Sequence, residues 1–157
     1  MSWWGTKTEE DTHSGEYGDL SETQQQVFEQ FKDTIKQEKL TDSPRYDDFY
    51  LLKFCRARKF DLDKTVEMFK NFLNWREENK VDQAMVIYDC PNIPNIKRSY
   101  QHGYHAHDRE GRPFYIERPC LMYIEEIFKI VPREELVQYY IREYEKFVHM
   151  RAPACSK

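Results

Sequence analysis

The chain of 157 residues is about the length of one ordinary domain. Its net charge of −4 is contributed by residues 1–19, so the remainder is neutral and lacks the basic block that a general nucleic-acid binder needs. Apolar runs of only a few residues exclude a membrane-spanning helix, and the N-terminus lacks the pattern of a secretory signal. We therefore expect a cytoplasmic protein.

The first half predicts a helical bundle after a mobile tail. Residues 1–19 are polar and aperiodic, apart from Trp3 and Trp4, which we expect to dock on the body. A capping-box pattern at Ser21 begins a helix, which a proline-containing segment ends, and two further amphipathic helices follow over about 47–58 and 62–77. Their predicted inward residues are Val27, Phe28, Phe31, Ile35, Phe49, Leu51, Leu52, Phe54, Cys55, Leu62, Val66, Phe69, Phe72, Leu73 and Trp75.

The second half changes character. After a helical turn over 82–87, prolines and asparagines in 88–95 predict a connector without regular structure. A hairpin follows, with strands over 99–107 and 112–118 around a turn that contains Gly111. Two helices come next, one over 123–130 and one with Pro132 at its first position. The second carries Leu136, Tyr140, Ile141, Tyr144, Phe147 and Val148 on one side.

The fold class that these patterns predict is mainly α with a short β-hairpin (α+β). A lone hairpin is marginal in water, and the amphipathic helices after it imply a larger sheet. We therefore assign 1–19 as a tail, 20–87 as the helical bundle, 88–98 as the connector and 99–157 as the incomplete start of an α/β domain.

The cysteines and glycines exclude several common sites. Cys55, Cys90, Cys120 and Cys155 form no C-x-x-C pair, so we expect free thiols and no zinc ribbon or dithiol redox site. Outside the tail the glycines are only Gly103 and Gly111, too few for a phosphate-binding loop or a dinucleotide motif. No cofactor is expected.

Three segments carry a resemblance to a known family. Residues 51–61, LLKFCRARKFD, followed by Met68-Phe69 and Trp75-Arg76, resemble the helical N-terminal region of the CRAL-TRIO lipid-transfer family. Residues 104–117, YHAHDREGRPFYIE, resemble its first hairpin, and 143–156 resemble the end of the following helix. The chain is most similar to the secretory phosphatidylinositol/phosphatidylcholine transfer proteins.

The resemblance implies a fold and a site. In the family, the bundle packs on an α/β domain whose apolar cavity is gated by a mobile helix, and most of that domain would follow residue 157. By position, Arg58 and Lys59 stand where family members contact a phosphoinositide headgroup. Tyr104 and Tyr115 stand where they contact a phosphatidylcholine headgroup.

The residues themselves leave alternatives open. Arg56, Arg58 and Lys59 suit a phosphate, yet they also complement the C-terminal dipole of a helix. Tyr104 and Tyr115 suit a quaternary ammonium, yet they also suit cross-strand packing.

Hairpin parity leaves the tyrosines open too. If Asp108 pairs with Gly111, the tyrosines are opposite each other. If Gly111 is instead a bulged third loop residue, Asp108 pairs with Arg112 and the tyrosines face opposite sides.

Neither a metal site nor an enzyme is expected. His102, His105 and His107 lie on one hairpin without a fixed acidic or thiolate partner, and no nucleophile has a base and an orienting group.

The leading hypothesis is a lipid-binding protein that exchanges phosphatidylinositol and phosphatidylcholine between membranes, in transient contact with the surface of secretory-pathway membranes. The alternative is a helical interaction module that binds a protein or an anionic membrane surface and holds no lipid.

Overall fold

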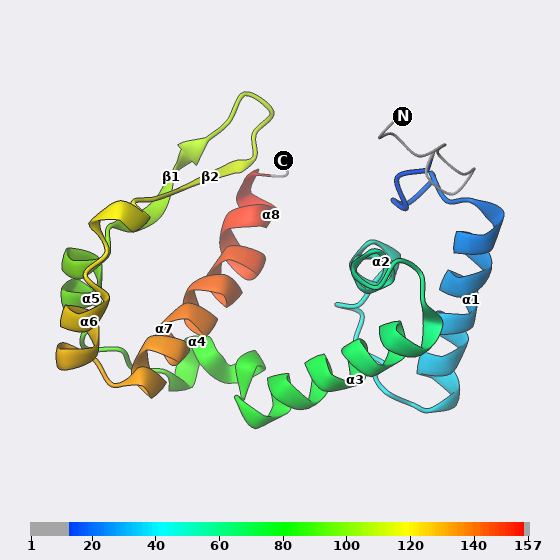
Figure 1. Ribbon diagram of the computed structural model, residues 1–157, viewed down its shortest axis with the longest axis horizontal. Coiled ribbons are helices and arrows are strands. Elements are labelled where there is room, and N and C mark those ends of the chain that lie inside the picture. Colours follow the sequence, from blue (N-terminus) through cyan, green and yellow to red (C-terminus); the bar gives the residue numbers. More distant parts are fainter. Residues whose placement is uncertain (1–12, 156–157) are drawn as a thin grey trace, which may run out of the picture. The chain divides into compact units, whose positions relative to one another are not determined.

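The computed structural model describes residues 13–155, so the expectation for Trp3 and Trp4 lies outside the described residues. These residues divide into two compact units at Trp75/Arg76. The first unit contains α1 (Glu22–Gln37), α2 (Asp48–Ala57) and most of α3 (Leu62–Glu78) (Figure 1). Within residues 13–155, no helix is long and apolar enough to cross a bilayer.

Polar caps fix the starts of these three helices, the first of them at Ser21 as the sequence predicts. Ser21 and Gln24 form the expected capping box, in which Gln24 N donates to Ser21 Oγ at 3.2 Å. The Asp47 carboxylate accepts from Tyr50 N at 2.8 Å, and that of Asp61 accepts from Lys64 N at 3.1 Å. Each cap satisfies a backbone N–H that has no partner inside its helix.

Aromatic side chains dominate the core of the first unit. Phe69 lies edge-on to Phe31 and Phe54, with ring centroids 5.5 and 5.1 Å apart. The cluster is completed by other buried side chains of the predicted stripes, namely Phe28, Ile35, Leu51, Leu52 and Cys55.

Two of the predicted inward residues are instead exposed. Phe49 is 63% exposed because it lies two residues, or about 200° around the helix, from the buried Leu51. Trp75 is 45% exposed at the end of the unit. The described end of the predicted tail also differs from expectation, since residues 13–19 form a hydrogen-bonded turn.

The second unit consists of short helices around one hairpin. After η2 (Val81–Gln83) and α4 (Ala84–Ile87), the segment predicted to lack regular structure contains a helix, α5 (Ile93–Ser99). The prediction failed because Pro94 lies in the first turn of α5, where a missing N–H breaks no hydrogen bond. The unit continues with β1 (His102–His107), β2 (Pro113–Glu117), η3 (Pro119–Leu121), α6 (Ile124–Ile130), α7 (Arg133–Lys146), the π-helical turn η4 (Phe147–Arg151) and α8 (Ala152–Cys155).

The observed fold confirms the predicted class, mainly α with a short antiparallel hairpin. Pro132 was predicted at the first position of α7 but occupies the N-cap position, so the helix begins one residue later, at Arg133. The predicted inward face of α7 is partly wrong, because Tyr139 is buried while Tyr144 is 64% exposed. The domain boundaries, and the assignment of 99–157 to an incomplete domain, stay predictions.

The hairpin combines both pairing alternatives. Near its tip, Asp108 N donates to Arg112 O at 2.8 Å, and Gly111 has a φ of +81°, so the loop is the longer one with a bulged glycine. An extra residue in β1, beside Ala106 with a φ of +53°, then shifts the register. Beyond this second bulge, Tyr104 pairs directly with Tyr115.

A buried ion pair joins the last residues of α3 to α7 inside the second unit. Arg76 Nη1 lies 3.1 Å from Glu145 Oε1, and both side chains are 7% exposed. Arg76 also pairs with Asp82, and His149 Nε2 lies 3.2 Å from the second oxygen of Glu145. Glu145, on α7, therefore connects α3 through Arg76 and the π-helical turn through His149.

We expect Glu145→Ala to lower the free energy of unfolding of the second unit by about 3 kcal/mol, because it leaves Arg76 buried without its main partner. The control is Glu77→Ala, which removes an exposed carboxylate from the same end of α3. It should change the free energy of unfolding by less than about 0.5 kcal/mol. Urea unfolding followed by circular dichroism measures both. Equal losses would show that the pair contributes nothing specific.

The hairpin glycines allow a second matched comparison. Gly111→Ala should cost about 1 kcal/mol, because alanine disfavours a φ of +81° and its Cβ would lie 3.4 Å from the Cys155 carbonyl oxygen. A Cβ at Gly103 would meet nothing within 4 Å, so Gly103→Ala should be nearly neutral. Thermal unfolding midpoints would contradict this account if the two variants were equally stable.

Candidate functional site

Arg58 and Lys59 lie in the tight turn between α2 and α3. Arg58 N donates to Phe54 O and Phe60 N donates to Cys55 O, which closes the end of α2. Both cationic side chains are exposed, and neither has an ion-pair partner among residues 13–155. The negative end of the α2 dipole lies beside them and favours positive charge there.

The backbone of this turn is unusual. Lys59 and Phe60 both have a left-handed φ, +53° and +58°, which residues other than glycine rarely adopt. The Phe60 ring lies so close to Gly15 that a Cβ there would approach it to 2.9 Å. The turn is thus fixed by backbone hydrogen bonds to α2 and by the contact between the Phe60 ring and Gly15. The two cationic side chains are exposed to solvent.

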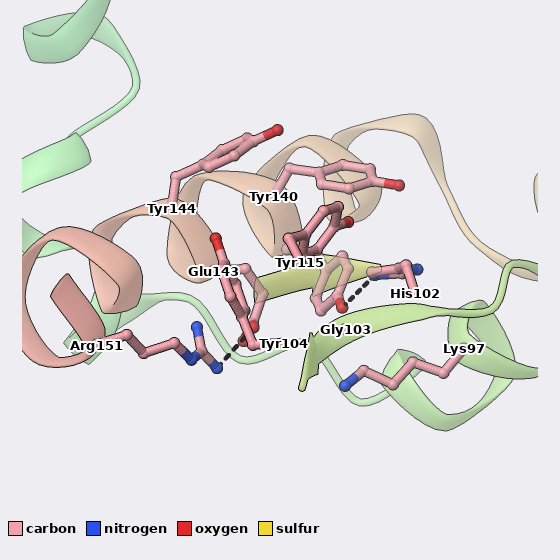
Figure 2. A pocket seen from close by; sticks show the side chains of 10 residues that line it. Lys97, His102, Gly103, Tyr104, Tyr115, Tyr140, Glu143, Tyr144 and Arg151 are labelled. Carbon is pink, nitrogen blue, oxygen red and sulfur yellow. Dashed lines mark hydrogen bonds and ion pairs between the residues drawn. The ribbon is translucent and has the colours of Figure 1, made fainter. Parts of the chain in front are cut away.

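Tyr104 and Tyr115 line a cavity of about 330 Å³ in the second unit (Figure 2). The hairpin forms one wall, and α7 forms the other with three more tyrosines. Ring centroids of Tyr104 and Tyr115 are 5.0 Å apart. The full lining comprises Lys97, His102, Gly103, Tyr104, Tyr115, Tyr139, Tyr140, Glu143, Tyr144 and Arg151.

A cation already lies on one of these rings. The Arg151 guanidinium carbon is 4.5 Å from the Tyr104 ring centroid, and Phe147 stacks on Tyr104 at 5.4 Å. Glu143 accepts from Arg151 at 3.2 Å and from Lys146 at 2.9 Å. Burial raises the pKa of Glu143, but the two cations outweigh it and lower the pKa below its ordinary value. The cavity therefore contains an ionised carboxylate and an aromatic face that accommodates positive charge.

Hydrogen bonds fix polar groups in and behind the hairpin wall of the cavity. His102 Nδ1 lies 2.8 Å from the Tyr100 carbonyl oxygen and donates to it, because a carbonyl oxygen can only accept, and His102 Nε2 shares a hydrogen bond of 2.7 Å with the Tyr139 hydroxyl. Tyr100 in turn donates to the Glu117 carboxylate. Burial, which is the main cause, and the negative charge of Glu117, which is the second, raise the pKa of Tyr115 to about 12, so this phenol is neutral at physiological pH.

The structure thus brings Tyr104 and Tyr115 together in the second unit, while Arg58 and Lys59 belong to the first. Sequence reasoning missed Tyr139, Glu143 and Arg151, and interpreted Tyr140 and Tyr144 as core packing. Their spacing of four residues was the available signal for a shared face. His102, considered for a metal, is hydrogen-bonded within the aromatic wall, and the four cysteines are free thiols.

Comparison with known proteins identifies the bundle. Residues 24–71 match the family described as CRAL/TRIO, N-terminal domain. This chain is 40% identical over 114 residues to "Phosphatidylinositol/phosphatidylcholine transfer protein SFH9" of Arabidopsis thaliana, which covers 72% of the chain and 20% of that protein. It is 36% identical over 144 residues to "SEC14 cytosolic factor" of Kluyveromyces lactis, which covers 92% of the chain and 47% of that protein.

The first unit therefore contains a CRAL/TRIO N-terminal helical domain. The similarity to the CRAL-TRIO family that the sequence resemblance predicts is thus confirmed, by the match to its N-terminal domain and by the two relatives. It spans a fifth to a half of the length of the relatives it matches, with 20% of the Arabidopsis protein and 47% of the Kluyveromyces protein.

Proposed function

We propose that this chain is the headgroup-binding part of a non-enzymatic protein that exchanges phosphatidylinositol and phosphatidylcholine between membranes. The relatives' names supply the lipid class. The observation that carries the proposal is the tyrosine-lined cavity of the second unit. We place its action in the cytoplasm, at secretory-pathway membranes; a relative's name, "cytosolic factor", supports the first of these.

The cavity suits a choline headgroup in size and chemistry. Its volume of about 330 Å³ lies at the lower end of the range of small-molecule pockets, roughly 300–1,000 Å³, and fits a headgroup rather than acyl chains. Trimethylammonium donates no hydrogen bond, so ring faces bind it, each contributing roughly 0.5–2 kcal/mol. The ionised Glu143 adds a negative charge on the same wall.

Arg58 and Lys59 suit the second lipid. A guanidinium donates two parallel hydrogen bonds to a phosphate, whereas an ammonium acts as a point charge. Both side chains are exposed at a fixed turn, without an ion pair to break among residues 13–155. We assign them to the phosphoinositide headgroup.

The first test measures phosphatidylcholine bound to the chain after incubation with vesicles, by native mass spectrometry. We expect a one-to-one adduct, and Tyr104→Ala should lower its amount about tenfold by removing one aromatic face. Tyr123→Ala, whose ring is 63% exposed outside the cavity, should leave it unchanged. Bare protein at saturating lipid would contradict the proposal and favour the interaction module.

The second test uses phosphatidylinositol in the same measurement. Arg58→Ala should reduce the phosphatidylinositol adduct about tenfold, because it removes the guanidinium assigned to the inositol headgroup. It should spare phosphatidylcholine, whose headgroup is assigned to the tyrosine cavity. The control is Lys36→Ala, which removes a lysine side chain that is 77% exposed on α1 and should leave both adducts unchanged. If both lipids were lost equally, the assigned role of Arg58 would be wrong.

A further inference from the structure

The outer side of α2 carries an unusual exposed stripe. Phe49, Lys53 and Arg56 recur at i, i+4 and i+7, which places them on one side of the helix. The core residues Leu51 and Phe54 lie on the other side. Phe49 is 63% exposed, and the Lys53 ammonium lies 4.6 Å from the Tyr50 ring centroid. The stripe thus combines a solvent-facing aromatic ring with two cations.

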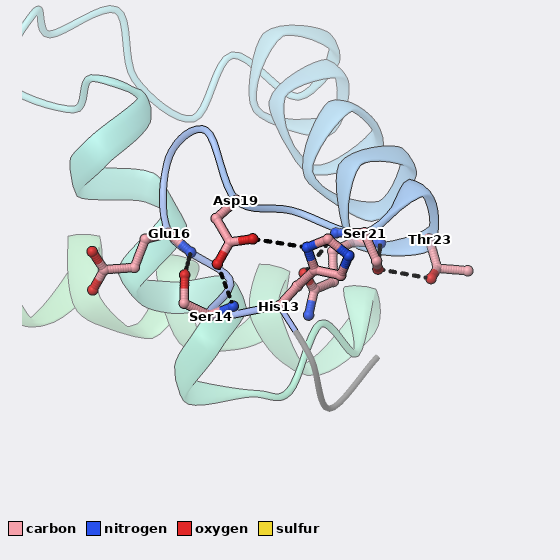
Figure 3. A network of polar contacts seen from close by, with 7 residues as sticks. His13, Ser14, Glu16, Asp19, Ser21 and Thr23 are labelled. Atoms are coloured by element: carbon pink, nitrogen blue, oxygen red, sulfur yellow. Dashed lines mark hydrogen bonds and ion pairs between the residues drawn. The ribbon is translucent and has the colours of Figure 1, made fainter. Parts of the chain in front are cut away.

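The turn of residues 13–19 is built to hold a fixed shape. The Asp19 carboxylate accepts from Ser14 N at 2.8 Å and pairs with His13 Nδ1 at 2.8 Å (Figure 3). The backbone N–H of Ser14, then its side chain and His13, lower the pKa of Asp19 to about 2. The carboxylate therefore stays ionised, and the turn keeps these bonds until the pH falls towards 2.

This turn packs along the α2 stripe. The Tyr17 and Phe49 ring centroids are 4.6 Å apart, yet the two side chains remain 57% and 63% exposed. Glu16, the preceding residue, pairs with Arg56 at 2.6 Å. Tyr17, Phe49, Lys53 and Arg56 form one surface, here called the α2 outer face, in which an exposed aromatic pair lies beside basic groups.

We propose that the α2 outer face is a membrane-contact surface for a bilayer that contains anionic phospholipid. The Tyr17 ring, with its polar hydroxyl, suits the headgroup level of a bilayer, the apolar Phe49 ring suits the boundary with the acyl chains, and each nearby Lys or Arg is attracted by the surface charge. The Tyr17 and Phe49 rings already contact each other at a tilt before any bilayer is bound, so little side-chain freedom is lost on docking.

The acidic groups near this surface are largely engaged. Asp47 caps α2, and Asp48 lies 3.6 Å from Lys32. Glu16 opposes binding, because it neutralises Arg56, but its side chain is 69% exposed and such surface pairs contribute little stability. A lipid phosphate would replace Glu16 at Arg56. The inference deepens the proposed function, which requires contact with a membrane, by naming the surface that makes it.

The test is co-sedimentation with phosphatidylcholine vesicles prepared with and without phosphatidylserine. Phe49→Ser should weaken binding to the anionic vesicles about tenfold, because it removes a ring that the bilayer would bury. The control Tyr123→Ser removes a ring of equal 63% exposure outside the α2 outer face and should leave binding unchanged. Lys53→Gln should weaken it about fivefold and Lys36→Gln should not. Glu16→Gln should strengthen it by releasing Arg56.

Several results would overturn the inference. Binding unchanged in Phe49→Ser, or lost equally in the Tyr123 control, would remove the aromatic pair from the contact. A dimer in analytical ultracentrifugation that Phe49→Ser abolishes, without vesicle binding, would assign the surface to a second copy of the chain. None of these variants alters the tyrosine cavity or Arg58, so phospholipid adducts measured separately report on the proposed function alone.

Discussion

The second unit depends on the ion pair between Arg76 and Glu145. The Glu145 carboxylate and the Arg76 guanidinium are both 7% exposed, so each needs partners inside the protein, and each is a partner of the other. This requirement fixes the rotation of α7 about its axis. With Glu145 and Ile141 turned inward, Tyr140 and Tyr144 face the hairpin, where they line the cavity with Tyr104 and Tyr115. A charged contact thus determines which aromatic rings are available to a ligand.

The sequence predicted those parts of the structure that local rules control. Ser21 marked the start of the first helix, because a capping side chain acts within three residues of itself. Phe49 was misplaced, since one turn of helix offers two plausible apolar faces and only packing selects between them. The helix at Pro94 was missed because proline stops a helix in its interior and not in its first turn.

The candidate site shows the same division. The motif around Arg58 and the pairing candidates at Tyr104 and Tyr115 were visible in the sequence. The register was not, because it results from two bulges that offset each other, one at Gly111 and one beside Ala106. Arg151 could not have been found at all from spacing, since it reaches Tyr104 through the fold of the π-helical turn.

The position of Arg151 has a consequence for any ligand of the tyrosine cavity. Because its guanidinium already lies over the Tyr104 ring, 4.5 Å from the centroid, an incoming ammonium group must exchange with a resident one. The contribution of the Tyr104 face to the measured affinity would then be the difference between two cation–π contacts. Guanidinium salts would act on this cavity as competitors as well as denaturants, so urea is the reagent that separates loss of binding from loss of fold.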